Sequence, residues 1–578
     1  MTEWAMTNMA PIMFGCLALF LISGIPVAFA LASCGLVFAY IGIGLDMLPA
    51  SLVQALPLRV FGIMANETLL AIPFFTFMGL VLQRSGMAED LLDTVGQVFG
   101  AMRGGLALAV VLVGSLLAAT TGVVAASIIA MGLISMPIML RYGYDRRVAS
   151  GVITAAGSLA QVVPPSLVLI VMADQLGRSV GDMYAGALVP AAMLIGAYVV
   201  LIVVLAILFP RMLPALPPEA RIYKEPDGGS GLRSLVVLAA LGLAAGWLAV
   251  TYYPLALSSI GRFVKPPTDE LVMVALAGGV LFAFLAAVVD ALLHLHLLSQ
   301  IARRVTFVLI PPLLLIFLVL GTIFIGLATP TEGGAMGAVG ALSLAAARRR
   351  LDINQFMDAL LATTKLATFV LFILLGATMF SLTFQAVDGN VWVEHLFEKL
   401  PGGSTGFLIA VTALVFFLGF FLDFFEIAFI LLPLLAPIAN KLGIDLIWFG
   451  VLIGINLQTS FLTPPFGFAL FYLRSVAPLE DYMDPVTGNR VGKVTTGQIY
   501  AGALPFIAIQ LGLLALIIAY PALVIGDRAN AANTRIAPGV ISDQLWNMGS
   551  QRPGGEAPEI DLDALFGTPP APGKPSNP

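Results

Sequence analysis

Long apolar runs restrict what this chain can fold into more than any other feature of its sequence. A helix needs about 20 predominantly apolar residues to cross the hydrocarbon core of a bilayer. Twelve candidate runs lie at residues 9–23, 25–45, 65–84, 148–176, 185–209, 233–253, 271–293, 305–327, 331–347, 362–384, 448–474 and 498–521. Only 11% of the residues are charged, whereas soluble domains have about 25%. The sequence therefore predicts an all-α polytopic membrane protein in a lipid bilayer.

Two further apolar runs, 106–140 and 405–438, are too long for a single span. Each has a polar or glycine-bearing interruption near its middle, ATTG at 119–122 and LDFFE at 422–426. A helix that stops at such an interruption and turns back leaves the membrane on the side where it entered. We therefore expect two re-entrant helical hairpins in addition to about twelve spans.

Basic residues predict the orientation of the spans. They gather in four loops, at Arg141, Arg146 and Arg147; at Arg211, Arg221 and Lys224; at Arg303 and Arg304; and at Arg348, Arg349 and Arg350. With the spans and hairpins above, all four loops fall on one face, which the excess of Lys and Arg in cytoplasmic loops identifies as the cytoplasmic face. Both termini are then periplasmic.

The chain also repeats itself at an offset of 300 residues. The matching positions are Pro137 and Pro437, Gly143 and Gly443, Asp145 and Asp445, and the pairs Pro164-Pro165 and Pro464-Pro465; the segment YAGAL at 184–188 recurs at 500–504. Each copy has five crossings, which is an odd number, so the second copy must be inverted relative to the first. The expected organisation is a first repeat at 1–210, a cytoplasmic loop and two extra spans at 211–300, a second repeat at 301–524, and a disordered periplasmic tail at 525–578.

Each of these two repeated Pro-Pro pairs lies within a span, at 148–176 and at 448–474. Proline removes a backbone donor and clashes with the preceding turn, so both spans should be broken. Unpaired backbone groups at membrane depth are tolerated where they line a cavity or bind something. Inverted repeats with broken helices are the architecture of secondary transporters. A simple kink packed against Ser or Thr is the alternative interpretation.

The sequence argues against an enzyme. The nearest approach to a phosphate-binding loop, GNRVGKV at 488–494, has the wrong spacing and lacks the Ser or Thr that would bind magnesium. Cys16 and Cys34 lie in apolar surroundings and are read as packing residues. We expect no cofactor, no metal other than Na⁺ as a coupling ion, and no nucleic-acid partner.

Four stretches resemble the large membrane subunit of tripartite ATP-independent periplasmic (TRAP) transporters. They are AIPFFTFMG (71–79), GYDRRVASGVITAAGSLAQVVPPSLVL (143–169), TPTEGGAMGAVGAL (329–342) and GFFLDFFEIAFILLPLLAPIANKLGIDLIWFGVLIGINLQTSFLTPPFGFALF (419–471). The resemblance covers roughly residues 10–525, and the extra span pair is similar to a longer subfamily. It implies a bacterial inner-membrane, Na⁺-coupled importer of the ion-transporter superfamily, working as an elevator. It also implies two partners, a separate small four-helix membrane subunit and a periplasmic solute-binding protein.

The first hairpin departs from the family pattern. Thr121 and Ser127 stand where many family members have a serine- and aspartate-containing tip, which removes the expectation of a carboxylate ligand there. Hydroxyl and carbonyl oxygens suit a weakly held monovalent cation. Packing of small residues between helices is the alternative.

We assign candidate sites to both tips and both breaks. The residues expected to bind Na⁺ are Thr120, Thr121, Gly122, Gly157, Ser158, Val163, Asp423, Thr459, Thr463 and Pro464. Those expected to contact the substrate are Ser127, Gln161, Glu426, Asn456, Gln458 and Ser460. Asp423 and Glu426 are three residues apart and should share a helix face. Glu332, at an outer turn, is expected to have a scaffold role.

Three functional interpretations follow. The first is Na⁺-coupled import of a small organic anion, a carboxylate, delivered by a binding protein that sets the identity of the solute. The second is a stand-alone Na⁺-coupled anion symporter of the same superfamily. The third is a channel or a structural membrane component, which two inverted half-sites argue against.

Overall fold

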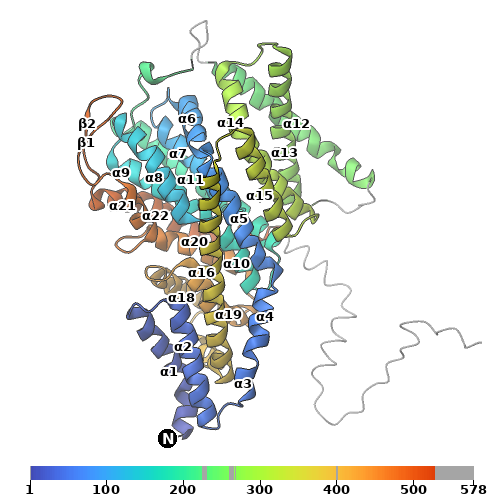
Figure 1. Ribbon diagram of the computed structural model, residues 1–578, viewed down its shortest axis with the longest axis vertical. Helices are drawn as coiled ribbons and strands as arrows, with labels where there is room; N and C mark the ends of the chain where they lie inside the picture. The colour runs from blue at the N-terminus through green and yellow to red at the C-terminus, as the bar shows by residue number, and fades with distance from the viewer. Residues whose placement is uncertain (1, 224–230, 260–265, 267, 399–400, 527–578) are drawn as a thin grey trace, which may run out of the picture. The chain divides into compact units, whose positions relative to one another are not determined.

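The computed structural model describes residues 2–223, 231–259, 266, 268–398 and 401–526. Most of the tail predicted at 525–578, and Lys224 in the second basic loop, lie outside the described residues. Within them the chain is helical apart from one short antiparallel ribbon, in which β1 (Tyr482–Met483) pairs with β2 (Arg490–Val491) (Figure 1). The prediction of an all-α membrane fold is confirmed.

The N-terminal part contains the three expected spans and three helices that were not predicted. The elements are α1 (Thr2–Ile22), α2 (Val27–Gly44), α3 (Ser51–Gln54), α4 (Leu56–Met64), α5 (Glu67–Arg84) and α6 (Met87–Phe99). The segments Ser51–Met64 and Glu67–Arg84 meet at an angle of 47°. Pro26 precedes α2, and the left-handed Gly24 makes the turn between α1 and α2.

A hairpin, a broken helix and a closing helix follow. The hairpin consists of α7 (Gly105–Thr121) and α8 (Val124–Arg141); the broken helix of α9 (Arg146–Ser158), the 3₁₀ turn η1 (Leu159–Gln161) and α10 (Leu167–Gln175); and the closing helix is α11 (Val180–Leu208). The second half repeats this order with the hairpin α18 (Gly403–Leu418) and α19 (Phe424–Lys441), the broken helix α20 (Leu446–Leu462) and α21 (Phe468–Val476), the ribbon, and α22 (Thr496–Ala519) with the short α23 (Ala522–Ile525).

The remaining helices join these two units. They are η2 (Pro218–Ala220), α12 (Leu232–Ser259), α13 (Thr268–Leu293), α14 (Gln300–Ile325), α15 (Pro330–Ala347), α16 (Ile353–Ala386) and α17 (Gly389–Glu398). The expected extra spans are α12 and α13, which pack against each other through close backbone contact at Gly246 and Ala275. The long α16 runs beside α2 and α5 (Figure 1).

The number of spans differs from the predicted twelve when helix length alone is used. Among the described residues, nine helices are long and apolar enough to cross a bilayer, and the bent pair would make a tenth. Four shorter apolar helices lie at Asn8–Ile22, Gly105–Thr121, Gly403–Leu418 and Leu446–Leu462. Breaks divide the spans at 148–176 and 448–474 into shorter helices, and the unbroken α15 is not among the nine. Two of the nine, α8 and α19, are hairpin arms rather than predicted spans.

The unpredicted helix α6 connects the arginine-bearing loops. Its Asp90 lies 3.0 Å from Arg350, 3.1 Å from Arg348 and 3.6 Å from Arg304. Farther along α6, Gln97 donates a hydrogen bond to the carbonyl of Ala220, beside Arg221. Hydrogen bonds between backbone groups also link the 209–216 segment to residues 100, 104 and 145. The prediction that the basic loops share one face is confirmed for the described residues.

The two halves meet along α9 and α22. Gly151 of α9 and Gly502 of α22 allow backbone contact, because a Cβ at Gly151 would lie 2.0 Å from the Gly502 carbonyl oxygen. Next to this crossing, Gln510 of α22 donates a 2.7 Å hydrogen bond to the hydroxyl of Tyr198 in α11. Both tips and both breaks are therefore held in one packed unit by helices from opposite halves.

Candidate functional site

The tip of the first hairpin is a two-residue turn that touches the first break. Between α7 and α8, Gly122 has a left-handed backbone with φ of 59°. A Cβ on Gly122 would lie 2.9 Å from Cγ of Leu167, the first residue of α10. Glycine is therefore required twice here, for its conformation and for the close approach. The first tip therefore contacts the residue at which α10 begins, directly after the first break.

Buried hydroxyl groups line this tip. Thr120 and Thr121 each donate a hydrogen bond to the Leu117 carbonyl, at 2.9 and 3.0 Å. The hydroxyl of Thr121 also lies 2.6 Å from that of Ser127, so the two share a hydrogen bond across the turn. All three hydroxyl-bearing side chains are at most 3% exposed. The tip is a buried, uncharged cluster of oxygen atoms.

The first break runs from the end of α9 to the start of α10 and contains a cis Pro164-Pro165 bond. Within the described residues, the carbonyl oxygen of Val163 accepts no hydrogen bond. The Gln161 side chain is fully buried, and neither its amide nitrogen nor its amide oxygen has a partner. Buried polar groups are normally paired, so the Gln161 amide has hydrogen-bonding capacity that no described residue uses.

A hydrogen bond joins the two breaks. Ser158 accepts it from Nε2 of Gln458 at 3.2 Å, and the two residues occupy equivalent positions in the two repeats. Nearby, Gly157 packs so closely on α8 that a Cβ would lie 2.4 Å from Cγ1 of Ile128. The oxygen of the Gln458 amide is buried and unpaired. The two repeats therefore contact each other at repeat-related residues.

The second tip corrects one expectation. Asp423 and Glu426 were predicted to share a helix face, but Asp423 precedes α19 as its N-cap, with an extended ψ of 165°. Glu426, in the first turn, reaches back to accept a 2.8 Å hydrogen bond from the Asp423 amide. An Asp followed three residues later by Glu is a capping-box pattern, and this local bond overrides the i, i+3 arrangement. Both side chains are half-buried.

Aromatic rings surround the second tip. Contacts between neighbouring rings link Phe416, Phe417, Phe420, Phe421, Phe424 and Phe425 in pairs. The ring of Phe421 lies 5.5 Å from that of Phe466 in the second break, centroid to centroid. The second tip thus touches its own break, as the first does, but through apolar rings rather than through hydroxyl groups.

The polar residues before the second Pro-Pro pair donate hydrogen bonds to different helices. Asn456 and Ser460 donate to carbonyls of α18, those of Thr412 at 2.8 Å and Phe416 at 2.9 Å. Thr459 and Thr463 donate to carbonyls one turn earlier in their own helix. The sequence assigned Thr459 and Thr463 to Na⁺ and Asn456 and Ser460 to the substrate. In the structure the substrate pair bonds to the hairpin helix α18, and the Na⁺ pair bonds within α20.

The second break is more open than the first. Pro165 and its neighbours are buried, whereas Pro465 is exposed and Phe466 is 46% exposed. The peptide bond between Pro464 and Pro465 is cis, and the Tyr500 hydroxyl donates to the Pro465 carbonyl at 3.0 Å. In the described residues the Pro464 carbonyl accepts no hydrogen bond. Glu332, expected to have a scaffold role, forms a capping box with Thr329 at the start of α15.

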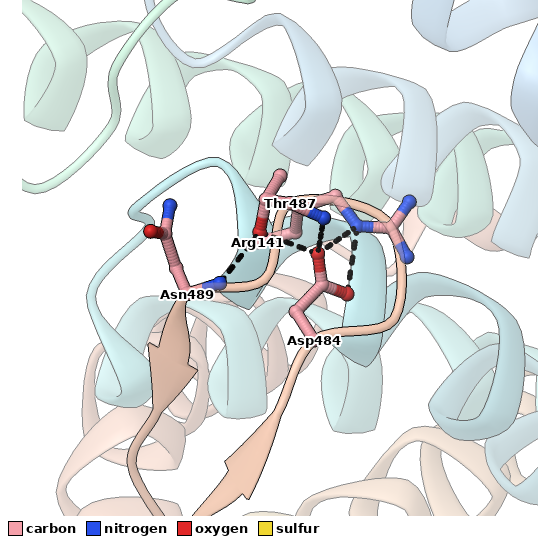
Figure 2. Close-up of polar contacts among 4 residues, drawn as sticks. All are labelled: Arg141, Asp484, Thr487 and Asn489. Carbon is pink, nitrogen blue, oxygen red and sulfur yellow. Dashed lines mark hydrogen bonds and ion pairs between the residues drawn. The ribbon is translucent and has the colours of Figure 1, made fainter.

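The loop at 478–497 is a feature whose structure was not predicted. Its carboxylate Asp484 is 1% exposed and accepts hydrogen bonds from Nε of Arg141 at 3.0 Å and from the Thr487 hydroxyl and amide (Figure 2). The hydrogen bond from the Thr487 hydroxyl is the largest cause of the lowered pKa of Asp484; burial opposes it, and the Thr487 amide and Arg141 add to the lowering. The Asp-Pro and Thr-Gly pairs at 484–488 were the available turn signals.

Residues 14–222 and 238–523 match the family model described as the DctM component of tripartite ATP-independent periplasmic transporters. This match spans most of the chain. The chain belongs to the TRAP transporter large-permease family. The resemblance predicted from its motifs is thereby confirmed, and the chain is a multi-pass membrane protein.

Several relatives of this TRAP permease are similar over most of its length. The C4-dicarboxylate TRAP transporter large permease protein DctM of Pseudomonas aeruginosa is 28% identical over 81% of this chain and 88% of its own. The protein YgiK of Salmonella typhimurium is 26% identical over 89% of this chain and 95% of its own. The isethionate TRAP transporter permease protein DctMQ of Oleidesulfovibrio alaskensis is 25% identical over 81% of this chain and 60% of its own.

Proposed function

We propose that this TRAP permease couples the entry of Na⁺ to the import of a small organic anion delivered by a periplasmic solute-binding protein. The observation that carries the proposal is the meeting of two hairpin tips with two broken helices, joined by the Ser158–Gln458 hydrogen bond. Interrupted helices that meet at the boundary between inverted repeats are typical of ion and substrate sites in secondary transporters.

The coupling ion is held by oxygen atoms in this proposal. In the first half these are the hydroxyl groups of Thr120 and Thr121 and the unpaired carbonyl of Val163. In the second half they are the Asp423 carboxylate and the unpaired carbonyl of Pro464. A hard monovalent cation prefers such ligands. Unpaired carbonyls inside a membrane protein are tolerated where they line a cavity or bind an ion.

The substrate is an anion of the class named for two relatives, a C4-dicarboxylate in one and isethionate in the other. The tips and breaks, at 117–127, 157–167, 416–426 and 456–467, contain no Arg or Lys. Recognition would then depend on hydroxyl groups, side-chain amides and the half-helix N-termini of α10 and α21, which favour negative charge. Gln161 and Gln458, whose buried amides have unpaired atoms, are the leading candidates for substrate contact.

Alternating access would come from elevator movement. The moving body comprises the two hairpins with the two broken helices, and the scaffold comprises the spans around α2, α5 and α16. The arginine-bearing face is cytoplasmic and the termini are periplasmic in an inner-membrane orientation. A separate small membrane subunit and the binding protein complete the transporter.

Reconstitution tests the coupling. Purified permease, small subunit and binding protein are placed in liposomes, and uptake of a radiolabelled anion is measured with an inward Na⁺ gradient. We expect uptake that requires external Na⁺ and the binding protein. Equal uptake with K⁺ alone contradicts Na⁺ coupling, and equal uptake without the binding protein favours a stand-alone symporter.

Cysteine labelling tests the orientation. Single cysteines replace Asp145 and Asp445 in a chain that has Cys16 and Cys34 removed, and intact cells are treated with an impermeant thiol reagent. We expect position 445 to react from outside and position 145 to react only after permeabilisation. The reverse pattern contradicts the proposed orientation.

A further inference from the structure

A polar cavity lies on the arginine-bearing face, away from both tips and both breaks. It has a volume of about 310 Å³ and separates the α8–α9 connection from the β1–β2 ribbon. Arg141 and Arg146 line one side, Asn489 and Arg490 the other, and Gln498 of α22 the end. A water molecule occupies about 30 Å³ in the liquid, so the cavity can hold a small polar group with part of a larger molecule.

Arg141 is held in place through its Nε, and its Nη donors remain unused among the described residues. Its Nε lies 3.0 Å from both carboxylate oxygens of Asp484, which is almost fully buried and is also bonded to Thr487. Figure 2 shows the two Nη atoms pointing away from that carboxylate. Within the described residues they form no hydrogen bond. A guanidinium fixed by one edge presents its other donors at low entropic cost.

The guanidinium of Arg146 forms no hydrogen bond or ion pair with the described residues, although the residue is only partly exposed. Its guanidinium lies beneath the ribbon, where a Cβ on Gly492 would come within 2.3 Å of Nη2. The ribbon therefore passes Arg146 at a position that has no side chain. A partly buried guanidinium without an acceptor is unfavourable, because it has lost water without gaining a counter-charge.

The other polar groups in the cavity mostly donate. The Gln498 oxygen accepts from the Thr495 amide, which leaves its amide nitrogen free for the cavity. Arg490 pairs with Asp481 at 2.9 Å. The one carboxylate on the lining, Asp145, has an oxygen bonded to the Arg147 amide at the start of α9. The free donors outnumber the free acceptors, so the cavity favours an anion.

We propose that this cavity binds a phosphate group. The guanidinium groups of Arg141 and Arg146, together with the Gln498 side-chain amide at the end of the cavity, can engage several oxygens of one tetrahedral anion. Arginine suits phosphate in this manner. The phosphate comes either from an anionic lipid headgroup at the membrane surface or from a soluble phosphate compound. Basic pockets on the cytoplasmic side of membrane helices bind lipid headgroups in this way.

The repeat-related position on the other face is different. There a cavity of about 420 Å³ lies between Gln175–Arg178 and the 433–446 segment. Its lining has one basic residue, Arg178, and the connection from α10 to α11 is too short to form a ribbon. The phosphate site therefore has no counterpart on the other face, because it combines two arginines of the first repeat with the ribbon inserted in the second.

Two measurements test the site on the full-length permease. In detergent, inorganic phosphate is titrated while the thermal unfolding midpoint is followed. In nanodiscs of phosphatidylcholine containing a minor fraction of phosphatidylglycerol, native mass spectrometry counts the phosphatidylglycerol molecules retained. The variants are Arg146→Gln and, as the matched control, Arg147→Gln, which lies next in the chain but outside the cavity. A third variant, Gly492→Ala, displaces Arg146 without removing it.

We expect Arg146→Gln and Gly492→Ala to weaken binding about tenfold, the size of one lost charge-assisted hydrogen bond, and Arg147→Gln to leave it unchanged. Stabilisation by inorganic phosphate identifies a soluble phosphate compound, and retention of phosphatidylglycerol alone identifies a lipid headgroup. No phosphate or lipid binding by the unmodified chain overturns the proposal. Equal loss in Arg146→Gln and Arg147→Gln also overturns it, because it indicates attraction by net charge only. The unfolding midpoint without phosphate shows that each variant is folded.

Discussion

The two hairpin tips occupy equivalent places in the repeat and are built from different chemistry. The first turns in two residues, at Gly122 and Val123, and is buried among hydroxyl groups. The second takes five residues, Gly419–Asp423, and combines a half-buried acidic pair with a cluster of phenylalanines. Each tip nevertheless touches the break of its own half.

This difference shows that a hairpin turn can contact its break with or without charged side chains at the tip. The first tip depends on close packing, since Gly122 meets Leu167 and the Thr121 and Ser127 hydroxyls bond across the turn. The second tip depends on a local cap, since Glu426 accepts from the Asp423 amide. If both tips bind Na⁺, the first does so with neutral oxygens and the second with a formal negative charge. Changes of charge should therefore act on the second tip, and changes of shape on the first.

The largest expected effect is that of Asp423→Asn. Removing the charge weakens the second ion site and acts through the coupling between ion and substrate, which is typically about 1–3 kcal/mol or roughly 5–150-fold. We expect the Na⁺ dependence of uptake to move to higher Na⁺, with partial rescue at high concentration. The measurement is a Na⁺ titration of uptake in proteoliposomes, together with the thermal unfolding midpoint.

An unchanged Na⁺ dependence with a lower unfolding midpoint would assign Asp423 to capping of α19 alone. Glu426→Gln is the matched variant, because an amide oxygen can still accept from the Asp423 N–H. If both variants shift the Na⁺ dependence equally, the ion responds to the net charge of the tip rather than to Asp423 as a ligand.

The second effect in size concerns Gly122→Ala. A left-handed conformation costs an L-residue about 1–2 kcal/mol, and the new Cβ would also stand 2.9 Å from Cγ of Leu167. We expect a loss of stability beyond the conformational cost, and impaired transport. Gly177→Ala is the control, because Gly177 has φ of 61° but nothing within 4 Å of its Cβ position.

Chemical unfolding of both glycine variants in detergent micelles separates the two costs. Equal destabilisation would mean that Gly122 is needed only for its left-handed backbone conformation. The Leu167 side chain would then move aside for the added Cβ without a further cost in stability. In that case the stability of the first tip would not depend on its packing against Leu167.

The hairpins were predictable from the sequence because their ends and middles carry strong signals. The run predicted at 106–140 is observed as Gly105–Arg141, since the apolar stretch begins at a glycine turn and ends at a basic residue. The break near 119–122 is observed at Gly122 and Val123. The breaks at Pro164-Pro165 and Pro464-Pro465 were predicted from the loss of backbone donors, but a Pro-Pro pair does not decide this alone, since Pro311 and Pro312 lie inside the continuous helix α14.

Other elements gave weaker signals. The amphipathic α6, Met87–Phe99, carries acidic residues among its apolar ones, so a search for continuous apolar runs does not find it. Asp423 and Glu426 were read as a shared helix face, although DFFE before an apolar run also fits a capping box. The contact between Arg141 and Asp484 joins residues 343 apart in the sequence, and no local pattern predicts such a pair.

A third and smaller effect is expected where the two halves meet. Ser158→Ala removes the acceptor of the Gln458 amide, which costs about 1 kcal/mol for a typical hydrogen bond and more if the amide stays unpaired. A double-mutant cycle with Gln458→Met measures the coupling between them. We expect a coupling of at least 0.5 kcal/mol, the usual threshold for residues in contact, and additive effects would show that the two breaks are energetically independent.

The smallest expected effect comes from Thr463→Val, and Thr121→Val is its counterpart in the first half. The Thr463 hydroxyl bonds only to the Thr459 carbonyl in its own helix, so replacing it with an isosteric methyl should change the unfolding free energy by less than about 0.5 kcal/mol. The Thr121 hydroxyl bonds to Leu117 and Ser127, and its loss leaves Ser127 without that partner, so we expect the unfolding free energy to fall by about 1 kcal/mol.

If Thr463 is an ion ligand, Thr463→Val shifts the Na⁺ dependence of uptake while the protein remains as stable as the unmodified chain. A shift in stability without a shift in Na⁺ dependence would remove Thr463 from the ion site. The same result at Thr121 would remove the first tip as well, and would leave the hydroxyl cluster as packing between two small-residue helices.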